Sequence, residues 1–264
     1  MKKPKRNSAR ARFFSGTFLT LTLISCQAGV CQPLFSSAGR RPALEAAPAP
    51  VAEKKKGNAS LDTLTGGEVI EGFSTSALYL TDDNQAIGGR FKHLRSGLTL
   101  DLIQIQTAPQ AFVWVNTPPA SDSGAAHTQE HLLLGKGSKG RSLRTAEQMS
   151  LVTASAMTKQ WRTCYHFNTT AGAEVFYEHT ERLLDALLNP DYTDDEIKRE
   201  VCHYGILKDS KSGSLTLKEQ GTVYNEMASS VHDPAFPLWQ AEYRDLYGVD
   251  HPLSYSSGGT PDGL

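Results

Sequence analysis

The chain has 264 residues, of which 39% are hydrophobic, and this size and composition suit a globular protein of one large or two small domains. Its formal net charge of −1 is unevenly divided, because residues 1–60 hold 11 Lys and Arg against 2 Asp and Glu (+9), which leaves 16 against 26 (−10) for residues 61–264. The acidic body argues against nucleic acid as a partner and favours cationic substrates, and it has no run of 18 apolar residues that would span a membrane.

The first 60 residues predict a leader and a tether. Residues 1–12 contain six Lys or Arg and no acid, and residues 13–26 are mostly apolar or Ser and Thr, which predicts a signal or targeting segment over 1–32. Residues 23–26, Leu-Ile-Ser-Cys, look like a bacterial lipobox, which implies a periplasmic or outer-membrane lipoprotein whose lipid on Cys26 is its one membrane attachment. The alternative is a mitochondrial presequence, since the leader is rich in Arg and Ser. Residues 33–60, rich in Pro, Ala, Ser and Gly, predict a disordered linker.

The body, residues 61–264, is expected to form one domain of mixed secondary structure. Alternating and β-branched runs predict strands over 72–81, 92–107, 111–116 and 160–169. Apolar spacing and capping signals predict helices over 145–157, 173–188, 193–206 and 215–231, the third of which starts at a capping box from Thr193 to Glu196. Helices and strands alternate without a βαβ repeat, so the predicted class is α+β, with a mixed or antiparallel sheet packed against helices.

One short motif contains the candidate metal-binding and catalytic residues. Residues 127–131 read His-Thr-Gln-Glu-His and run into three leucines, directly after the predicted strand 111–116 and a turn. On a helix, His127 and His131 lie one turn apart on the same face, with Glu130 beside them. Two imidazoles at this spacing can bind zinc, and the adjacent carboxylate can act as general base toward the attacking water. The order is that of an inverzincin motif, and the bland alternative is a helix with two surface histidines.

A glycine pattern, G-x-G-x-x-G, follows at residues 135–140. A dinucleotide-binding loop would follow a strand and open a helix, whereas this pattern follows a predicted helix and we expect no helix to open within it. We therefore interpret it as the loop that ends the motif helix, with Gly135 as its C-cap.

Zinc needs a third protein ligand from further along the chain. Four carboxylates on predicted helices are candidates, and their spacing alone does not choose among them: Glu196, Glu200, Glu219 and Glu226.

Residues 118–134 resemble the zinc helix of the pitrilysin/insulinase family of metallopeptidases. Four further segments, in the same order, are similar to motifs of its presequence-protease subfamily: Arg-Thr-Cys-Tyr at 162–165, Glu-Val-Cys-His-Tyr at 200–204, Gly-Thr-Val-Tyr-Asn-Glu-Met at 221–227 and Ser-Gly-Gly-Thr-Pro at 257–261. The resemblance covers about residues 70–264.

The resemblance implies a zinc-dependent metalloendopeptidase that hydrolyses short unfolded peptides. It implies Zn²⁺ held by His127, His131 and Glu226, with Glu130 as catalytic base and Glu200 orienting a ligand histidine. It also implies that an extended peptide docks as an added strand near the residues Ser155, Ala156, Arg162 and Tyr165. Glu219 is the reserve ligand.

The chain departs from this subfamily in two ways. Ser155 stands where the subfamily has an Asn that is expected to hold substrate. The subfamily also has a second half, so this chain is expected to be incomplete at its C-terminus or to be completed by a second chain. The alternative function is therefore a non-catalytic or remnant subunit that binds peptides and needs a partner chain. The body's two cysteines, Cys164 and Cys202, are expected to be thiols rather than a disulfide.

Overall fold

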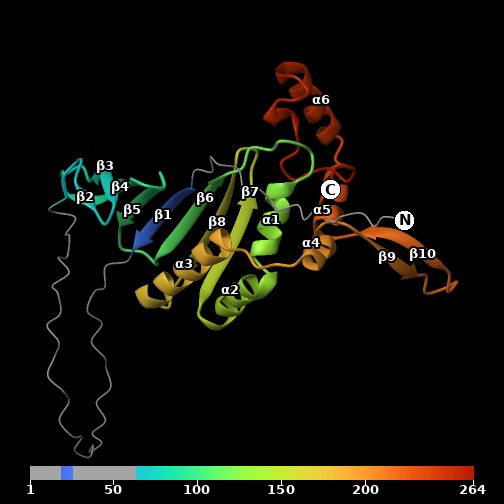
Figure 1. Cartoon of the computed structure of the whole chain (residues 1–264), viewed down its shortest axis with the longest axis horizontal. Coiled ribbons are helices and arrows are strands. Elements are labelled where there is room, and N and C mark those ends of the chain that lie inside the picture. Colours follow the sequence, from blue (N-terminus) through green and yellow to red (C-terminus); the bar gives the residue numbers. More distant parts are fainter. Residues whose placement is uncertain (1–18, 26–63) are drawn as a thin grey trace, which may run out of the picture.

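An eight-stranded sheet organises the protein (Figure 1). The computed structural model describes residues 19–25, as backbone only, and residues 64–264. The strand order is β2-β3-β4-β5-β1-β6-β8-β7, and all neighbours are antiparallel apart from β1 and β5. The strands are β1 (Leu19–Ser25), β2 (Val69–Ile70), β3 (Phe73–Leu80), β4 (Ala86–His93), β5 (Thr99–Gln104), β6 (Gln110–Asn116), β7 (Val152–Thr158) and β8 (Arg162–Thr169).

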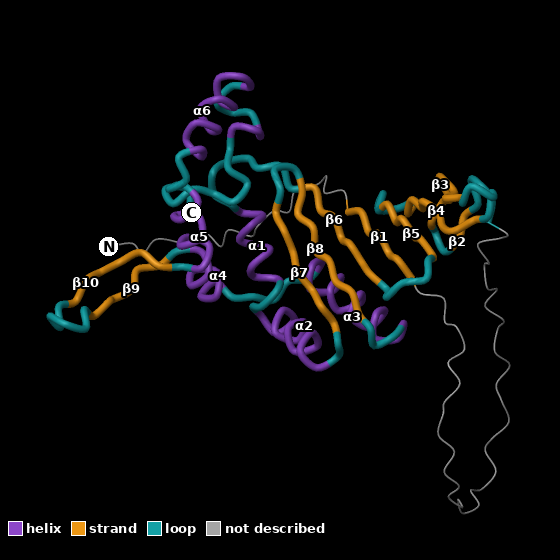
Figure 2. Tube along the Cα trace, turned by 180° about the vertical axis from the view of Figure 1, so that it is seen from behind, coloured by secondary structure: helices purple, strands orange, loops and turns teal. Residues whose placement is uncertain are grey.

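Three helices cover one face of β6, β8 and β7, as the views from the two sides show (Figures 1 and 2). They are α1 (Ala125–Leu133), α2 (Gly137–Met149) and α3 (Ala173–Leu188). Alternate residues of β6 and β8 point at these helices and form the core with them: Ala111, Val113, Tyr165, Phe167, Leu133, Leu143, Val152, Phe176, Leu183 and Ala186. The predicted α+β class is confirmed.

The remaining elements extend beyond this sandwich at the α1 end (Figure 2). They are α4 (Asp194–Val201), the hairpin β9 (His203–Lys208) and β10 (Leu215–Gln220), α5 (Thr222–Ser230), α6 (Ala235–Tyr247) and a short 3₁₀ turn (Pro252–Ser254). The predicted capping box is confirmed: the Thr193 hydroxyl accepts from the Glu196 amide, and the Glu196 carboxylate accepts from the Thr193 amide.

Two predictions between α1 and β8 are wrong. The helix predicted over 145–157 is α2, which starts at Gly137 and ends at Met149, followed by β7. Leu151 has a φ of +52°, which stops the helix, and the residues after it alternate in exposure as a strand does. Because α2 opens inside the glycine pattern, our expectation that no helix begins there is wrong, and the C-cap of α1 is Leu134 rather than Gly135.

Two more helix predictions fail in the next region. The helix from Thr193 ends at Val201 rather than near residue 206, because Cys202 is extended (φ −156°, ψ 133°) and β9 begins at the next residue, His203. The helix predicted over 215–231 divides at Gly221 into β10 and α5. A Cβ on Gly221 would lie 2.2 Å from the carbonyl oxygen of Val201, so this close approach requires glycine.

The predicted leader contributes one described element. Residues 19–25 form β1, paired on one side with β5 and on the other with β6. Cys26 and the linker 33–60 lie outside the described residues, so lipidation and the tether stay predictions. Among the helices that the structure describes, none combines the length and apolar character needed to cross a bilayer.

His179 on α3 predicts an acid-sensitive core. It is 2% exposed, its ring centroid lies 4.4 Å from that of Phe167, and its Nδ1 has no hydrogen-bond partner among the described residues. Burial, with a smaller contribution from the charge of nearby Arg182, lowers the pKa of His179 from 6.5 to about 4. The unfolded chain therefore binds the proton first as the pH falls, and stability drops between about pH 6.5 and 4.

We expect protonation of His179 to lower the free energy of unfolding by up to about 3 kcal/mol as the pH falls through this range. Urea unfolding at pH 7 and at pH 4.5 should therefore show a smaller loss of stability in His179→Leu than in the wild type. An equal loss in both chains would show that His179 does not carry the effect.

Candidate metal centre

The α1 helix is anchored on both sides. Leu132 and Leu133 are buried against the core. At its N-terminus Gly124 has a φ of +58°, and a Cβ there would lie 2.3 Å from the carbonyl oxygen of Gly258. Only glycine allows the loop around Gly258 to approach so closely. This packing fixes the helix on which His127, Glu130 and His131 lie.

Three side chains converge at one end of α1. The two Nε2 atoms of His127 and His131 are 3.1 Å apart. Oε1 of Glu226, on α5, lies 3.6 Å from Nε2 of His127, and the other oxygen, Oε2, lies 3.5 Å from Nε2 of His131. A tetrahedral zinc ion with bonds of about 2.0–2.1 Å separates its ligand atoms by about 3.3 Å. One imidazole nitrogen from each histidine and one oxygen of Glu226 all lie within 4.8 Å of one another, so the three side chains can reach three corners of a zinc tetrahedron.

The outer nitrogens of both imidazoles have acceptors. Nδ1 of His127 donates to the carbonyl oxygen of Gly258 at 3.2 Å, and Nδ1 of His131 donates to the Glu200 carboxylate at 3.1 Å. Because each proton is held on Nδ1, each Nε2 is left with a free lone pair toward the converging site. Both rings thus present an unprotonated nitrogen to the point where the three side chains converge.

Glu200 is the centre of a buried charge network. It is 6% exposed, and its second oxygen lies 2.8 Å from the ammonium nitrogen of Lys136. Burial acts to raise the pKa of Glu200, but the hydrogen bonds from Lys136, His131 and Thr222, together with the charge of Lys136, hold the pKa below its usual range. The carboxylate is therefore kept ionised and in place behind His131.

We expect Glu200→Gln to weaken zinc binding by about 10- to 100-fold, because the amide loses the charge that orients His131 and pairs with Lys136. Competition with a chromophoric chelator measures this affinity. Glu174→Gln, an exposed glutamate in the first turn of α3, is the matched control and should bind zinc as the wild type does. Equal zinc affinity in Glu200→Gln would remove Glu200 from the site.

Glu130 lies beside the three converging side chains but is not one of them. It is buried, and its carboxylate accepts a hydrogen bond of 2.6 Å from the Thr158 hydroxyl at the end of β7. The Thr158 hydroxyl is 3.2 Å from that of Thr163, which is 2.9 Å from that of Thr117. This chain of hydroxyls holds the carboxylate in position without neutralising it.

The other two ligand candidates are engaged elsewhere. Glu196 caps α4 and pairs with Arg141. These hydrogen bonds, first of all that from the Thr193 amide, lower the pKa of Glu196 to about 2. Glu219 on β10 accepts from the hydroxyls of Tyr204 (3.2 Å) and Tyr224 (2.6 Å). Of the four candidates, the structure brings Glu226 to the two histidines.

The predicted peptide-contacting residues fall into two groups. Ser155, which is exposed, and Ala156 lie on β7, the edge strand of the large sheet. Arg162 and Tyr165 lie on β8, inside the sheet. The Arg162 guanidinium sits 4.1 Å from the centre of the Trp114 ring, and Tyr165 is 3% exposed in the core. Of these two strands, β7 lies at an edge of the described sheet and β8 does not.

Sequence reasoning missed three supporting residues: Lys136, Thr158 and Gly258. Each acts through a contact with a residue far along the chain, so no local spacing marks it. Gly258 did carry a signal, since it stands in the Gly-Gly-Thr-Pro segment quoted for the resemblance. Cys164 and Cys202 are both free thiols, and burial raises the pKa of Cys164 to about 11.

Comparison with known proteins adds little to this geometry. No family model matches the chain. The chain is 33% identical over 144 residues to the uncharacterized protein YOL098C of Saccharomyces cerevisiae, an alignment that covers 52% of this chain and 13% of the yeast protein. The chain thus spans about an eighth of the length of this curated relative.

Proposed function

We propose that the chain is the N-terminal part of a zinc metalloendopeptidase of the pitrilysin/insulinase family, presequence-protease type, that hydrolyses short unfolded peptides. The observation that carries this proposal is the convergence of His127, His131 and Glu226 at separations of 3.1–3.6 Å, with Glu130 beside them and outside the set. Three protein ligands leave a fourth position open, which is typical of a catalytic rather than a structural zinc site.

The residues divide the work of hydrolysis between them. His127, His131 and Glu226 would hold the ion, which when bound supplies Lewis-acid polarisation of the scissile carbonyl and activation of water. Glu130 accepts a proton from the attacking water and returns it to the leaving amine nitrogen as the C–N bond breaks. Thr158 orients the Glu130 carboxylate, and Glu200 with Lys136 orients His131.

The free edge of β7 is the expected docking site for the peptide. β7 is paired on one side only, to β8, and Thr158 at its end contacts Glu130. An extended peptide that adds to this edge uses mainly backbone hydrogen bonds, which accept many sequences. This mode of binding fits an enzyme for unfolded peptides.

Hydrolysis of a quenched fluorescent, unstructured peptide by the full chain tests the proposal. We expect the protein to bind one zinc ion and to cleave the peptide, and chelation should abolish cleavage until zinc is returned. Absence of zinc binding under metal-replete conditions would overturn the proposal.

A partner-dependent form of the same site is the second candidate. The β9–β10 hairpin exposes Ile206 (71%), Leu215 (69%) and Leu217 (65%), although a two-stranded hairpin is marginally stable alone in water. Such a surface fits contact with a second chain or further domain. Bound zinc without turnover, and turnover restored by a partner chain, would support this form.

A further inference from the structure

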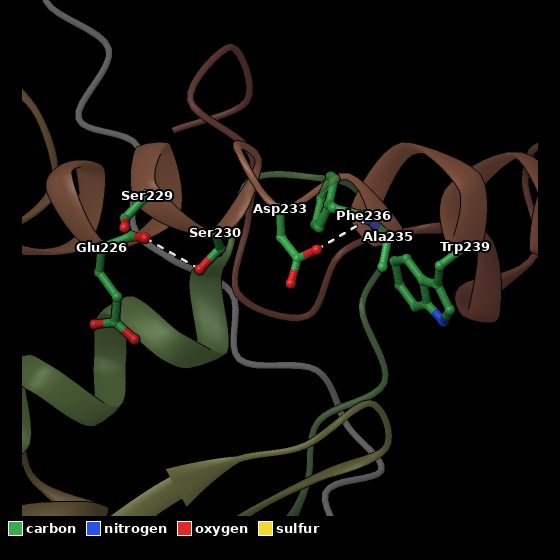
Figure 3. Close-up of a pocket in the computed structure, with 7 residues that line it drawn as sticks. All are labelled: Glu226, Ser229, Ser230, Asp233, Ala235, Phe236 and Trp239. Carbon is green, nitrogen blue, oxygen red and sulfur yellow. Dashed lines mark hydrogen bonds between the residues drawn. The ribbon is translucent and has the colours of Figure 1, made fainter.

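A cavity of about 490 Å³, here called the hairpin cavity, lies where the β9–β10 hairpin meets α4 and α5. Glu226 of the metal centre lines a different space, at the junction of α5 and α6 (Figure 3), and the two spaces share no lining residue. The hairpin cavity is therefore distinct from the metal centre. Its lining residues are Arg199, His203, Leu207, Lys218, Gln220, Gly221, Thr222 and Asn225.

The ionisable side chains that line the hairpin cavity are all basic. Arg199 comes from the last turn of α4, His203 from the start of β9 and Lys218 from β10, and no Asp or Glu is among the lining residues. Arg199 and Lys218 are exposed, and neither forms an ion pair with a carboxylate of residues 64–264. Two positive charges therefore border one space without a paired acid in the described part of the chain.

The register of the hairpin gathers its basic residues on one face. Gln220 pairs with His203, and Lys218 pairs with Gly205. Directly opposite and alternate residues of an antiparallel pair share a face, so these side chains lie on the side of the cavity. Glu219 lies between two of them in sequence but on the other face, where two tyrosine hydroxyls donate to its carboxylate. The hairpin thus separates its acid from its cations.

Neutral hydrogen-bonding groups accompany the two cations. A Cβ on Gly205 would lie 2.4 Å from Oε1 of Gln220, so this glycine leaves room for the Gln220 amide beside the cavity. Nδ1 of His203 has no hydrogen-bond partner among the described residues, so the ring keeps binding capacity. Gly221 and Thr222 place the positive end of α5 at the same space. An anion in the cavity would meet these groups as well as the two charges.

We propose that the hairpin cavity binds a phosphate group, either free or carried by a small organic phosphate. The guanidinium of Arg199 can bond two phosphate oxygens at once, and Lys218 adds a point charge. A phosphate group has nearly two negative charges and three acceptor oxygens at neutral pH, so it uses both cations, whereas a carboxylate has one charge and two oxygens.

The size of the hairpin cavity suits a ligand larger than phosphate itself. Its volume of about 490 Å³ is that of a small-molecule site, and Leu207 offers an apolar contact for an organic portion. No metal ligand lines this site, so phosphate binding does not depend on the proposed peptidase function.

Titration of the full chain followed by ³¹P NMR tests the site, with inorganic phosphate, glycerol phosphate and adenosine monophosphate as probes at constant ionic strength. We expect saturable line broadening with a Kd of about 1 mM or lower for at least one probe. The probe with the lowest Kd distinguishes free phosphate from an organic phosphate as the source. Acetate should compete about tenfold more weakly than phosphate, because it carries a single charge.

Matched variants locate the bound phosphate. Arg199→Gln and Lys218→Gln should each raise the Kd by about tenfold. The controls are Lys198→Gln, next to Arg199 on α4, and Lys208→Gln, on the opposite face of the hairpin, and both should bind phosphate as the wild type does. All four side chains are exposed, so the substitutions should leave the fold intact. Glu226→Ala should also keep its phosphate affinity, since Glu226 does not line the hairpin cavity.

Three results would overturn the phosphate site. The first is the absence of saturable binding for every probe, and the second is an unchanged Kd in both Arg199→Gln and Lys218→Gln. The third is loss of phosphate binding in Glu226→Ala, which would place the phosphate on the metal. Loss of zinc and hydrolysis in Glu226→Ala with phosphate binding intact would show that the two sites are separate.

Discussion

Glu130→Gln is expected to lower kcat for an unstructured peptide by about 10²–10⁴-fold, because the amide cannot accept the proton of the attacking water. Glutamine has nearly the same shape and can still accept the hydrogen bond from Thr158, so the site should keep its geometry. Glu130 is outside the set of converging ligand atoms, so bound zinc should remain near one ion per chain.

Both quantities must be measured on the same preparation. If Glu130→Gln no longer hydrolyses the peptide but keeps its full zinc content, Glu130 is the base. The control variant, Glu174→Gln on α3, should hydrolyse the peptide at the wild-type rate. If Glu130→Gln lost its zinc, or kept its kcat, the assigned role would be wrong.

Glu226→Ala is expected to weaken zinc binding by more than about 100-fold, since loss of a ligand should exceed the 10- to 100-fold effect of an outer partner. The two histidines that remain supply only two corners of the tetrahedron and no negative charge. Zinc content after dialysis against a weak chelator, together with hydrolysis of the same peptide, measures the effect.

The matched variant is Glu219→Gln. Glu219 was the reserve ligand on sequence grounds, and in the structure its carboxylate is held by the hydroxyls of Tyr204 and Tyr224. The Glu219→Gln variant should therefore bind zinc as the wild type does. The opposite pattern, with zinc lost from Glu219→Gln and kept by Glu226→Ala, would reverse the ligand assignment.

The sequence correctly predicted the elements whose conformation is set by interactions between residues close together in the chain. The helix over 173–188 appears with the predicted bounds, because its apolar spacing is regular and Asn189-Pro190 ends it. The capping box at Thr193 forms because both of its hydrogen bonds are local. The motif helix likewise forms where the His-x-x-Glu-His pattern predicted it.

The predictions failed for segments whose secondary structure is determined by contacts with residues far along the chain. Residues 215–220 have fair helical spacing, but pairing with β9 makes them a strand. The α6 helix was not predicted, and none of its residues is buried against the rest of the described structure. In the site, the two histidines are neighbours on one helix, whereas Glu226, Glu200 and Gly258 reach them only through tertiary packing. The family resemblance identified Glu226 and Glu200, which spacing alone could not do.

Residues 19–25 form β1 in the sheet and are also the centre of the predicted leader, and these two roles conflict. As the centre of the predicted leader, residues 19–25 would be threaded out of the compartment of synthesis; as β1, their backbone is paired on both sides, to β5 and to β6. If residues 19–25 belong to a targeting segment, a chain that folds first has that segment paired inside its own sheet. If the predicted leader is removed first, β5 and β6 lose the strand that lies between them. The order of folding and transport would therefore decide which of two sheets the mature protein has.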